Sequence, residues 1–203
     1  MNQPPKTFCQ SNIFEGGMGA VVIVRYKSGG RVEAGVFLLD TYCLGVKNAF
    51  FHQCDEAELP DLVQRMCGAG FGDPPTEHSG AWGRKLVEGA MEYARRLGFA
   101  PHRHYKQAAR VLGGINPKDC AETFVFGRDG KPYFIGGPDD GEARCNLILR
   151  VLTKKLGPQG FLFTIPGQGF REFFGDEEQD DEDFDEHDDE DDEEDDEDFD
   201  EHE

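Results

Sequence analysis

The sequence predicts an α+β domain with a mainly antiparallel sheet formed from two hairpins, followed by a long polyacidic tail. Strand-like runs occur in pairs joined by glycine turns, and helical segments lie between the pairs instead of alternating with single strands. An abrupt change of composition at Asp176 predicts the tail. We therefore expect one globular domain over 1–175, with a loose leader over 1–15, and a disordered segment over 176–203.

The first expected hairpin joins 20–26 to 32–40 through the turn residues 27–30. Both arms are nearly apolar, which predicts burial on both faces of the sheet. Apolar residues at helical spacing, followed each time by glycine, predict three helices over 59–67, 82–97 and 105–112.

A second hairpin is predicted over 123–135, where Asp129-Gly130 joins two aromatic-rich runs. Glycine tolerates the positive φ of such a turn. The segment 139–142 resembles a capping box with Asp in place of Ser or Thr, and it opens a helix that Gly157 ends. A last strand is expected over 161–165.

The net charge of −20 combines two opposite parts. Of the 28 residues in 176–203, 23 are Asp or Glu and none is Lys or Arg. Removing these 23 from the chain's 41 acids leaves 18 acids against 21 bases in 1–175, a net charge of +3. Within the tail, the heptad Asp181–His187 recurs as Asp196–His202. This pattern fits either an interaction tail that binds a basic surface or a tail that only aids solubility.

The chain carries no run of 18 or more apolar residues and its first residues lack the apolar core of a signal peptide, so we expect no membrane span and a cytoplasmic location. In that compartment cysteines stay reduced and pack as small hydrophobes. This expectation applies to all six: Cys9, Cys43, Cys54, Cys67, Cys120 and Cys145.

Three segments together resemble a domain of bacterial hypothetical proteins. They are Asp40–Lys47, Leu97–His102 and Phe126–Tyr133. The resemblance covers roughly 20–165 and leaves out the tail. It implies one coherent domain and a bacterial source, and it assigns no catalytic residue.

Candidate catalytic groups are few. Asp40 ends a buried strand, where metal-dependent nucleases often place a carboxylate, but one carboxylate does not make a two-metal site. Cys43 would need a base to act as a nucleophile, and His102 and His104 are the candidates considered with it. Packing is the simpler interpretation of Cys43. The spacing of histidines and cysteines fits no zinc site, and no phosphate-binding loop is present, so no metal or other cofactor is expected.

A basic stretch over 84–118 is the strongest candidate for binding, because cations follow phosphate backbones and aromatic groups stack on bases. The alternative is a solvated helix face with internal ion pairs to Glu88 and Glu92. The binding residues that we predict are Arg84, Lys85, Arg95, Arg96, Arg103, Lys106 and Arg110.

These features favour a nonenzymatic cytosolic binding or regulatory protein. Its mildly basic domain would engage a nucleic-acid or protein partner, and its tail would modulate that encounter or bind a basic protein. The alternative is a small metal-dependent hydrolase or nuclease that uses Asp40. The sequence leaves the oligomeric state open.

Overall fold

The computed structural model describes residues 3–68, 74–137 and 140–165. These residues all belong to the first of the two units into which the chain divides, 1–167. The predicted domain boundary at 175 and the predicted tail lie outside the described residues.

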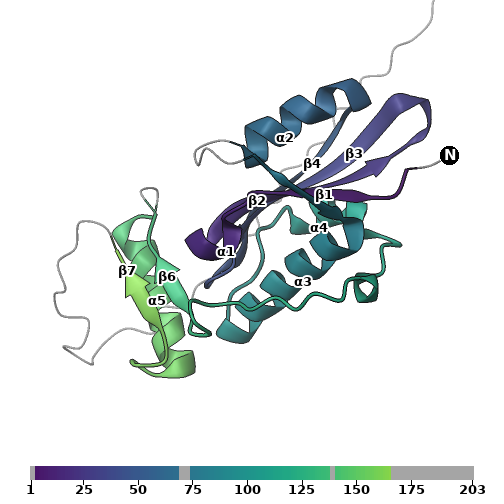
Figure 1. Cartoon of the computed structure of the whole chain (residues 1–203). Helices are drawn as coiled ribbons and strands as arrows, with labels where there is room; N and C mark the ends of the chain where they lie inside the picture. The colour runs from purple at the N-terminus through teal and green to yellow at the C-terminus, as the bar shows by residue number, and fades with distance from the viewer. Residues whose placement is uncertain (1–2, 69–73, 138–139, 166–203) are drawn as a thin grey trace, which may run out of the picture. The chain divides into compact units, whose positions relative to one another are not determined.

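Five strands form one antiparallel sheet in the order β4-β3-β2-β1-β5 (Figure 1). The strands are β1 (Lys6–Cys9), β2 (Met18–Tyr26), β3 (Arg31–Asp40), β4 (Gly45–Asp55) and β5 (Thr76–Ser79). The helices are α1 (Ile13–Gly16), α2 (Leu59–Cys67), α3 (Gly80–Leu97), α4 (Tyr105–Ala108) and α5 (Glu142–Leu156). Two further strands, β6 (Tyr133–Ile135) and β7 (Leu162–Thr164), form a separate pair. The predicted α+β class with an antiparallel sheet is confirmed.

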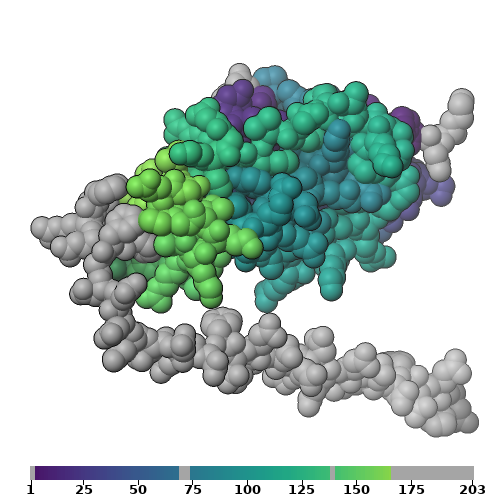
Figure 2. Space-filling view, turned by 90° about the horizontal axis from the view of Figure 1, so that it is seen from below, coloured from purple at the N-terminus to yellow at the C-terminus, as the bar shows by residue number. Residues whose placement is uncertain are grey.

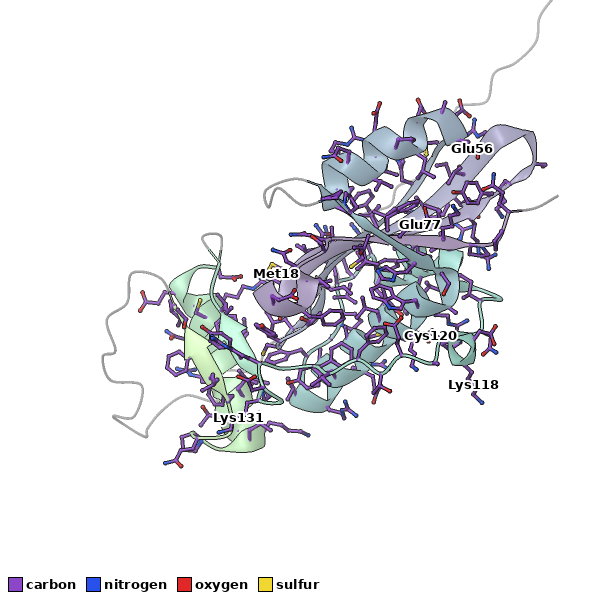
Figure 3. All side chains as sticks on the ribbon, viewed as in Figure 1. Met18, Glu56, Glu77, Lys118, Cys120 and Lys131 are labelled. Atoms are coloured by element: carbon purple, nitrogen blue, oxygen red, sulfur yellow. The ribbon has the colours of Figure 1, made fainter. Side chains whose placement is uncertain are left out.

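The sheet is covered on both faces. Helix α2 lies on one face, and α3 with α4 lies on the other (Figure 1). Alternate residues of β2 enter the two cores: Val21 packs into the core that contains α3, and Val22 packs into the core that contains α2. Side chains fill both spaces between sheet and helices (Figure 3). The nearly apolar composition of the first hairpin therefore reflects burial on both faces, as predicted.

The predicted helices are present. Helix α2 has the predicted bounds. Helix α3 begins two residues earlier than predicted, where Ser79 Oγ accepts a hydrogen bond from the backbone N–H of Trp82, and it ends at Gly98 with φ +100°. The predicted helix over 105–112 forms α4 and a 3₁₀ turn. No helix in the described part of the chain is long and apolar enough to cross a membrane.

The loose leader expected over 1–15 is wrong for Lys6–Cys9. This segment forms β1, which pairs with β2 on one side and β5 on the other. Successive side chains of this segment point to opposite faces of the sheet: Cys9 enters one core and Phe8 packs against the other. This alternation is typical of a strand in the middle of a sheet. The sequence also did not predict β4, which pairs with β3 from Gly45 to Asp55 with one register shift, between Leu38 and Leu39 of β3.

Only part of the second predicted hairpin forms. The tight turn is present, with φ +52° at Asp129 and +79° at Gly130, and Arg128 bridges to Lys131. The run 123–126 is not a strand, because its aromatic rings pack elsewhere. Phe124 stacks on Phe14 with ring centroids 5.8 Å apart, and Phe126 stacks on Tyr93 at 5.6 Å.

Strand β6 pairs with β7 in parallel, and α5 connects them. The predicted last strand and the end of α5 at Gly157 are confirmed. The prediction that Asp140 could cap this helix is wrong, since α5 begins at Glu142 with Gly141 as its N-cap and without a side-chain cap. The Asp140 carboxylate instead accepts a hydrogen bond from the backbone N–H of Gly137. Asp139 lies outside the described residues.

Replacing Gly130 by valine should destabilise this turn. Gly130 has open space around it but a φ of +79°, which a β-branched residue resists. We expect a loss of about 1–3 kcal/mol in the free energy of unfolding, measured by denaturant titration. Unchanged stability would show that the chain tolerates another turn geometry here.

Candidate functional site

The turn between β3 and β4 is built around Asp40. One oxygen of its carboxylate, Oδ1, accepts hydrogen bonds from the backbone N–H of Tyr42 at 2.9 Å and of Cys43 at 2.8 Å. The side chain is buried, with 4% of the residue exposed. Burial raises the pKa of Asp40, against the opposing effect of these hydrogen bonds and of Lys47. Asp40 therefore closes the turn and presents no free carboxylate to solvent.

Cys43 lies in the same turn and is fully buried. Burial raises its pKa well above the ordinary range, and the neighbouring Asp40 carboxylate raises it further. A reactive cysteine requires a lowered pKa and access to solvent. Its environment is that of a packed thiol, and the other five cysteines are buried and unbridged as well.

The three segments that carry the resemblance meet at this turn. The backbone N–H of Gly127 donates to Thr41 O at 2.9 Å, and that of Tyr133 donates to Tyr42 O at 3.1 Å. Further along, the backbone N–H of His102 donates to Val46 O at 2.9 Å. The turn 40–47 is thus the point at which distant parts of the chain are joined.

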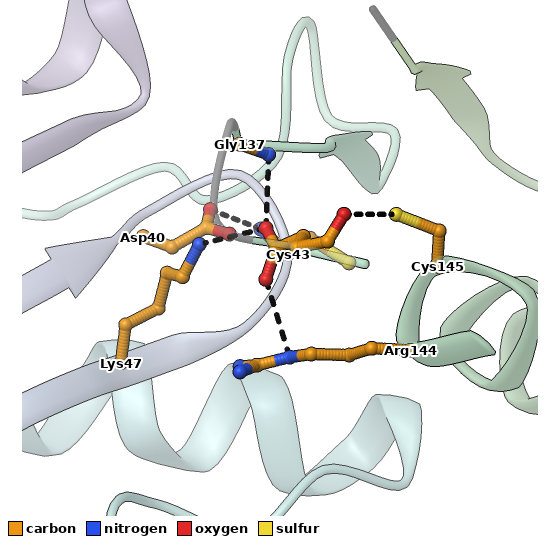
Figure 4. Close-up of polar contacts among 7 residues, drawn as sticks. Asp40, Cys43, Lys47, Gly137, Arg144 and Cys145 are labelled. Carbon is orange, nitrogen blue, oxygen red and sulfur yellow. Dashed lines mark hydrogen bonds and ion pairs between the residues drawn. The ribbon is translucent and has the colours of Figure 1, made fainter. Parts of the chain in front are cut away.

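Beside the turn, one carboxylate binds two cations (Figure 4). Asp140 Oδ2 lies 3.5 Å from Lys47 Nζ, and its Oδ1 lies 3.2 Å from Arg144 Nε. The Asp140 side chain is only 6% exposed. The sequence did not single out Lys47 or Arg144, and no local signal could have paired Lys47 with a residue 93 positions away.

The charge state of Asp140 follows from its neighbours. Burial acts to raise its pKa, but the hydrogen bond from Gly137 and the two cations, Lys47 and Arg144, outweigh it. The net effect lowers the pKa, so this carboxylate is ionised at neutral pH. One negative charge therefore faces two positive charges.

A pocket of about 380 Å³ opens next to this ion-pair cluster. It is lined by the start of β4, by the segment after α3 and by one face of α5. Its walls are mostly apolar, and its polar members are Lys47, His102 and Arg144.

The candidate catalytic residues do not converge. Asp40 and Cys43 share the turn, whereas His102 and His104 pack edge to face with ring centroids 5.0 Å apart. Among the described residues, no hydrogen bond joins either histidine to Asp40 or Cys43. Partial burial, with His104 and Arg103 nearby, lowers the pKa of His102. No group of three or more His, Cys, Asp or Glu suited to a metal ion occurs in the part of the chain that was placed.

Two of the predicted binding residues have structural roles. Arg84 pairs with Glu88 and donates through Nη1 to the carbonyls of Leu112 and Ile115. Lys85 Nζ donates to the carbonyls of Cys120 and Glu122, in the segment beside α3 (Figure 3). Both cations therefore attach the segment 109–122 to α3.

The remaining predicted cations are exposed and form no ion pair with another described residue. We call them the basic surface: Arg95, Arg96, Arg103, Lys106 and Arg110. They follow one another from the end of α3 through the next segment to the 3₁₀ turn after α4. Figure 2 looks onto the outer side of α3, where its surface lies beside that of α5.

Comparisons with protein-family models, with curated proteins and with solved structures found no match. A functional conclusion therefore depends on the residues and geometry described above. Of these, the basic surface and the pocket are the two features from which we argue below.

Proposed function

We propose that this protein is a nonenzymatic binding protein that engages nucleic acid through the basic surface. The observation that carries the proposal is that five cations within 95–110 are exposed and make no ion pair with another described residue. Such cations bind phosphates and release the counterions around them, which favours binding at low salt. If this stretch were only a solvated helix face with internal ion pairs, these cations would pair with nearby carboxylates, as Arg84 pairs with Glu88.

Aromatic groups among the cations support nucleic acid over other polyanions. The Arg110 guanidinium lies over the Phe51 ring, 5.5 Å from its centroid. Along the chain, His102 and His104 lie between Arg96 of α3 and Lys106 of α4. Bases stack on aromatic and guanidinium planes, so these groups could contact a single strand whose bases are exposed.

The hydrolase alternative has no observation in its favour. It depends on Asp40, whose carboxylate is buried and bonded to the backbone of its own turn. Metal-dependent hydrolysis needs carboxylates that face a shared metal position. A binding protein is therefore the better interpretation of this site.

A cytoplasmic location is part of the proposal. Six buried thiols without a disulfide fit a reducing compartment. Nucleic acid is also accessible to a protein in the cytoplasm of the bacterial source that the resemblance implies.

The acidic segment 176–203 would regulate the basic surface by charge. It is attached to the domain, so its 23 carboxylates act at a local concentration on the order of millimolar. At low ionic strength these carboxylates would compete with nucleic acid for the same cations. A partner with higher charge density would overcome the competition.

Removing residues 176–203 should therefore raise the affinity for nucleic acid, most strongly at low salt. Replacing Arg95, Arg96 and Arg103 by glutamate should abolish that gain, because each change removes a phosphate contact and adds repulsion. Fluorescence anisotropy with labelled single- and double-stranded oligonucleotides measures both effects. Thermal unfolding should show that the shortened chain still unfolds cooperatively.

A matched triple variant separates the basic surface from net charge. Glutamate at Arg150, Lys154 and Lys155 changes the charge by the same amount on α5, where all three are exposed. This variant should retain most of the gain in affinity. If the shortened chain binds nucleic acid no better than the full chain at low salt, the proposed competition is wrong. Equal losses in both triple variants would show that binding depends on net charge alone.

A further inference from the structure

The pocket beside the ion-pair cluster has the composition of a small-molecule site. Its volume of about 380 Å³ falls within the range of roughly 300–1,000 Å³ that such sites occupy. Leu147, at its edge, is 58% exposed and so is accessible to a ligand. The apolar walls comprise Leu44, Val46, Phe99, Leu147, Ile148 and Val151.

At the polar end of the pocket, Lys47 and Arg144 have hydrogen-bond donors that no described residue accepts from. Lys47 is 14% exposed, yet its ammonium has a single contact among the described residues, at 3.5 Å to Asp140. Arg144 engages Asp140 through Nε, and its two terminal nitrogens have no partner in the part of the chain that the structure describes. A guanidinium with both terminal nitrogens available can bind a carboxylate through two parallel hydrogen bonds.

The charges around these donors favour an anion. Asp140 is ionised and balances only one of the two cations. The nearby Asp40 interacts with Lys47, but burial raises the pKa of Asp40 and so favours its uncharged form. His102, whose pKa is lowered, is neutral at pH 7 and can accept or donate a hydrogen bond.

We infer that this pocket binds a small monocarboxylate with an apolar body. The carboxylate pairs with the terminal nitrogens of Arg144 and with Lys47, and the apolar body packs against Leu147 and Phe99. The inference does not depend on nucleic-acid binding, because Arg144 and Leu147 are not part of the basic surface. It assigns to the domain a second ligand of a different chemical class.

Isothermal titration calorimetry of the full chain at pH 7 tests the inference with three probes of equal length. Octanoate should bind saturably, and octanol should bind at least about tenfold more weakly, because only octanoate can form ion pairs with Arg144 and Lys47. Octylamine, which carries a positive charge, should not bind. Replacing Arg144 by glutamine should weaken octanoate binding at least about tenfold. Replacing Leu147 by aspartate should abolish binding, because it places a negative charge at the apolar wall.

Two control variants make comparable changes at exposed residues outside the pocket. Arg150→Gln removes an exposed arginine from the same helix, and Val125→Asp adds a carboxylate at a residue that is 69% exposed. Both should bind octanoate as the unaltered chain does. The inference is overturned if octanol binds as tightly as octanoate, if no saturable binding occurs below millimolar octanoate, or if the control variants weaken binding as much as R144Q and L147D.

Discussion

Replacing Gly45 by alanine should lower the free energy of unfolding by about 3–5 kcal/mol. Gly45 follows the turn closed by Asp40 and has φ +67°, where a Cβ atom is strained. An added Cβ would also lie 2.7 Å from the backbone oxygen of Ala90 and 2.7 Å from the Cβ of Ala94. Since both belong to α3, the clash would push the turn away from the helix. Chemical denaturation of the variant and the unaltered chain measures the loss.

Gly29→Ala is the matched control. Gly29 has φ +74°, close to that of Gly45, but nothing lies within 4 Å of the position of its Cβ. Gly29→Ala should therefore lower the free energy of unfolding by only about 1–2 kcal/mol, the cost of the strained backbone conformation. Equal losses at the two glycines would show that the turn does not press against α3 as described.

Replacing Asp40 by alanine should cost about 3 kcal/mol of stability. The change leaves two N–H donors, the part-buried one of Tyr42 and the buried one of Cys43, without their acceptor. Each buried donor left unpaired costs about 1–3 kcal/mol. The loss should appear as a lower denaturant midpoint without a change in the slope of the transition.

Asparagine at the same position keeps an acceptor oxygen and should lose less than about 1 kcal/mol at pH 7. The pH dependence follows from the raised pKa of Asp40, which favours its protonated form in the folded state. The unaltered chain therefore loses stability as the pH rises through the pKa of folded Asp40, and Asp40→Asn does not have this dependence. If Asp40→Asn is as damaging as Asp40→Ala, the carboxylate charge itself is needed, and the role assigned here to Asp40 is wrong.

Elements with strong local signals could be predicted from the sequence. Helix α2 has an apolar face at helical spacing and a glycine at its end, and its bounds were predicted without error. The β2–β3 hairpin has two apolar arms around adjacent glycines with positive φ, and it forms as predicted. In these cases the residues that define the element are close together in the chain.

Elements that depend on distant partners could not be predicted. Strand β4 mixes exposed polar residues such as Asn48 and Gln53 with buried ones, and its pairing with β3 determines its conformation. The run 123–126 has strand-like composition, but Trp82 and Tyr93 of α3 provide better packing for its rings. Tertiary contacts override local preference in both cases.

For the candidate sites, too, the sequence shows local features but not contacts between distant residues. The sequence shows a basic stretch, but it could not distinguish Arg84 and Lys85, which bind backbone carbonyls, from the exposed cations. It also could not bring Lys47 and Asp140 together, since only the folded chain places them side by side. Charge can be read from composition, whereas the availability of a charged group depends on its neighbours.

The salt dependence of nucleic-acid binding tests the central claim most directly. For residues 1–175 with a duplex oligonucleotide, the account predicts that the logarithm of the association constant falls linearly with the logarithm of salt concentration. The slope should be about −4 to −5 if all five cations of the basic surface contact phosphates, at about −0.9 for each contact. Glutamine at Arg95, Arg96 and Arg103 should reduce its magnitude by about 2.7. A slope near zero, or one that these substitutions leave unchanged, would contradict the claim that the basic surface binds nucleic acid.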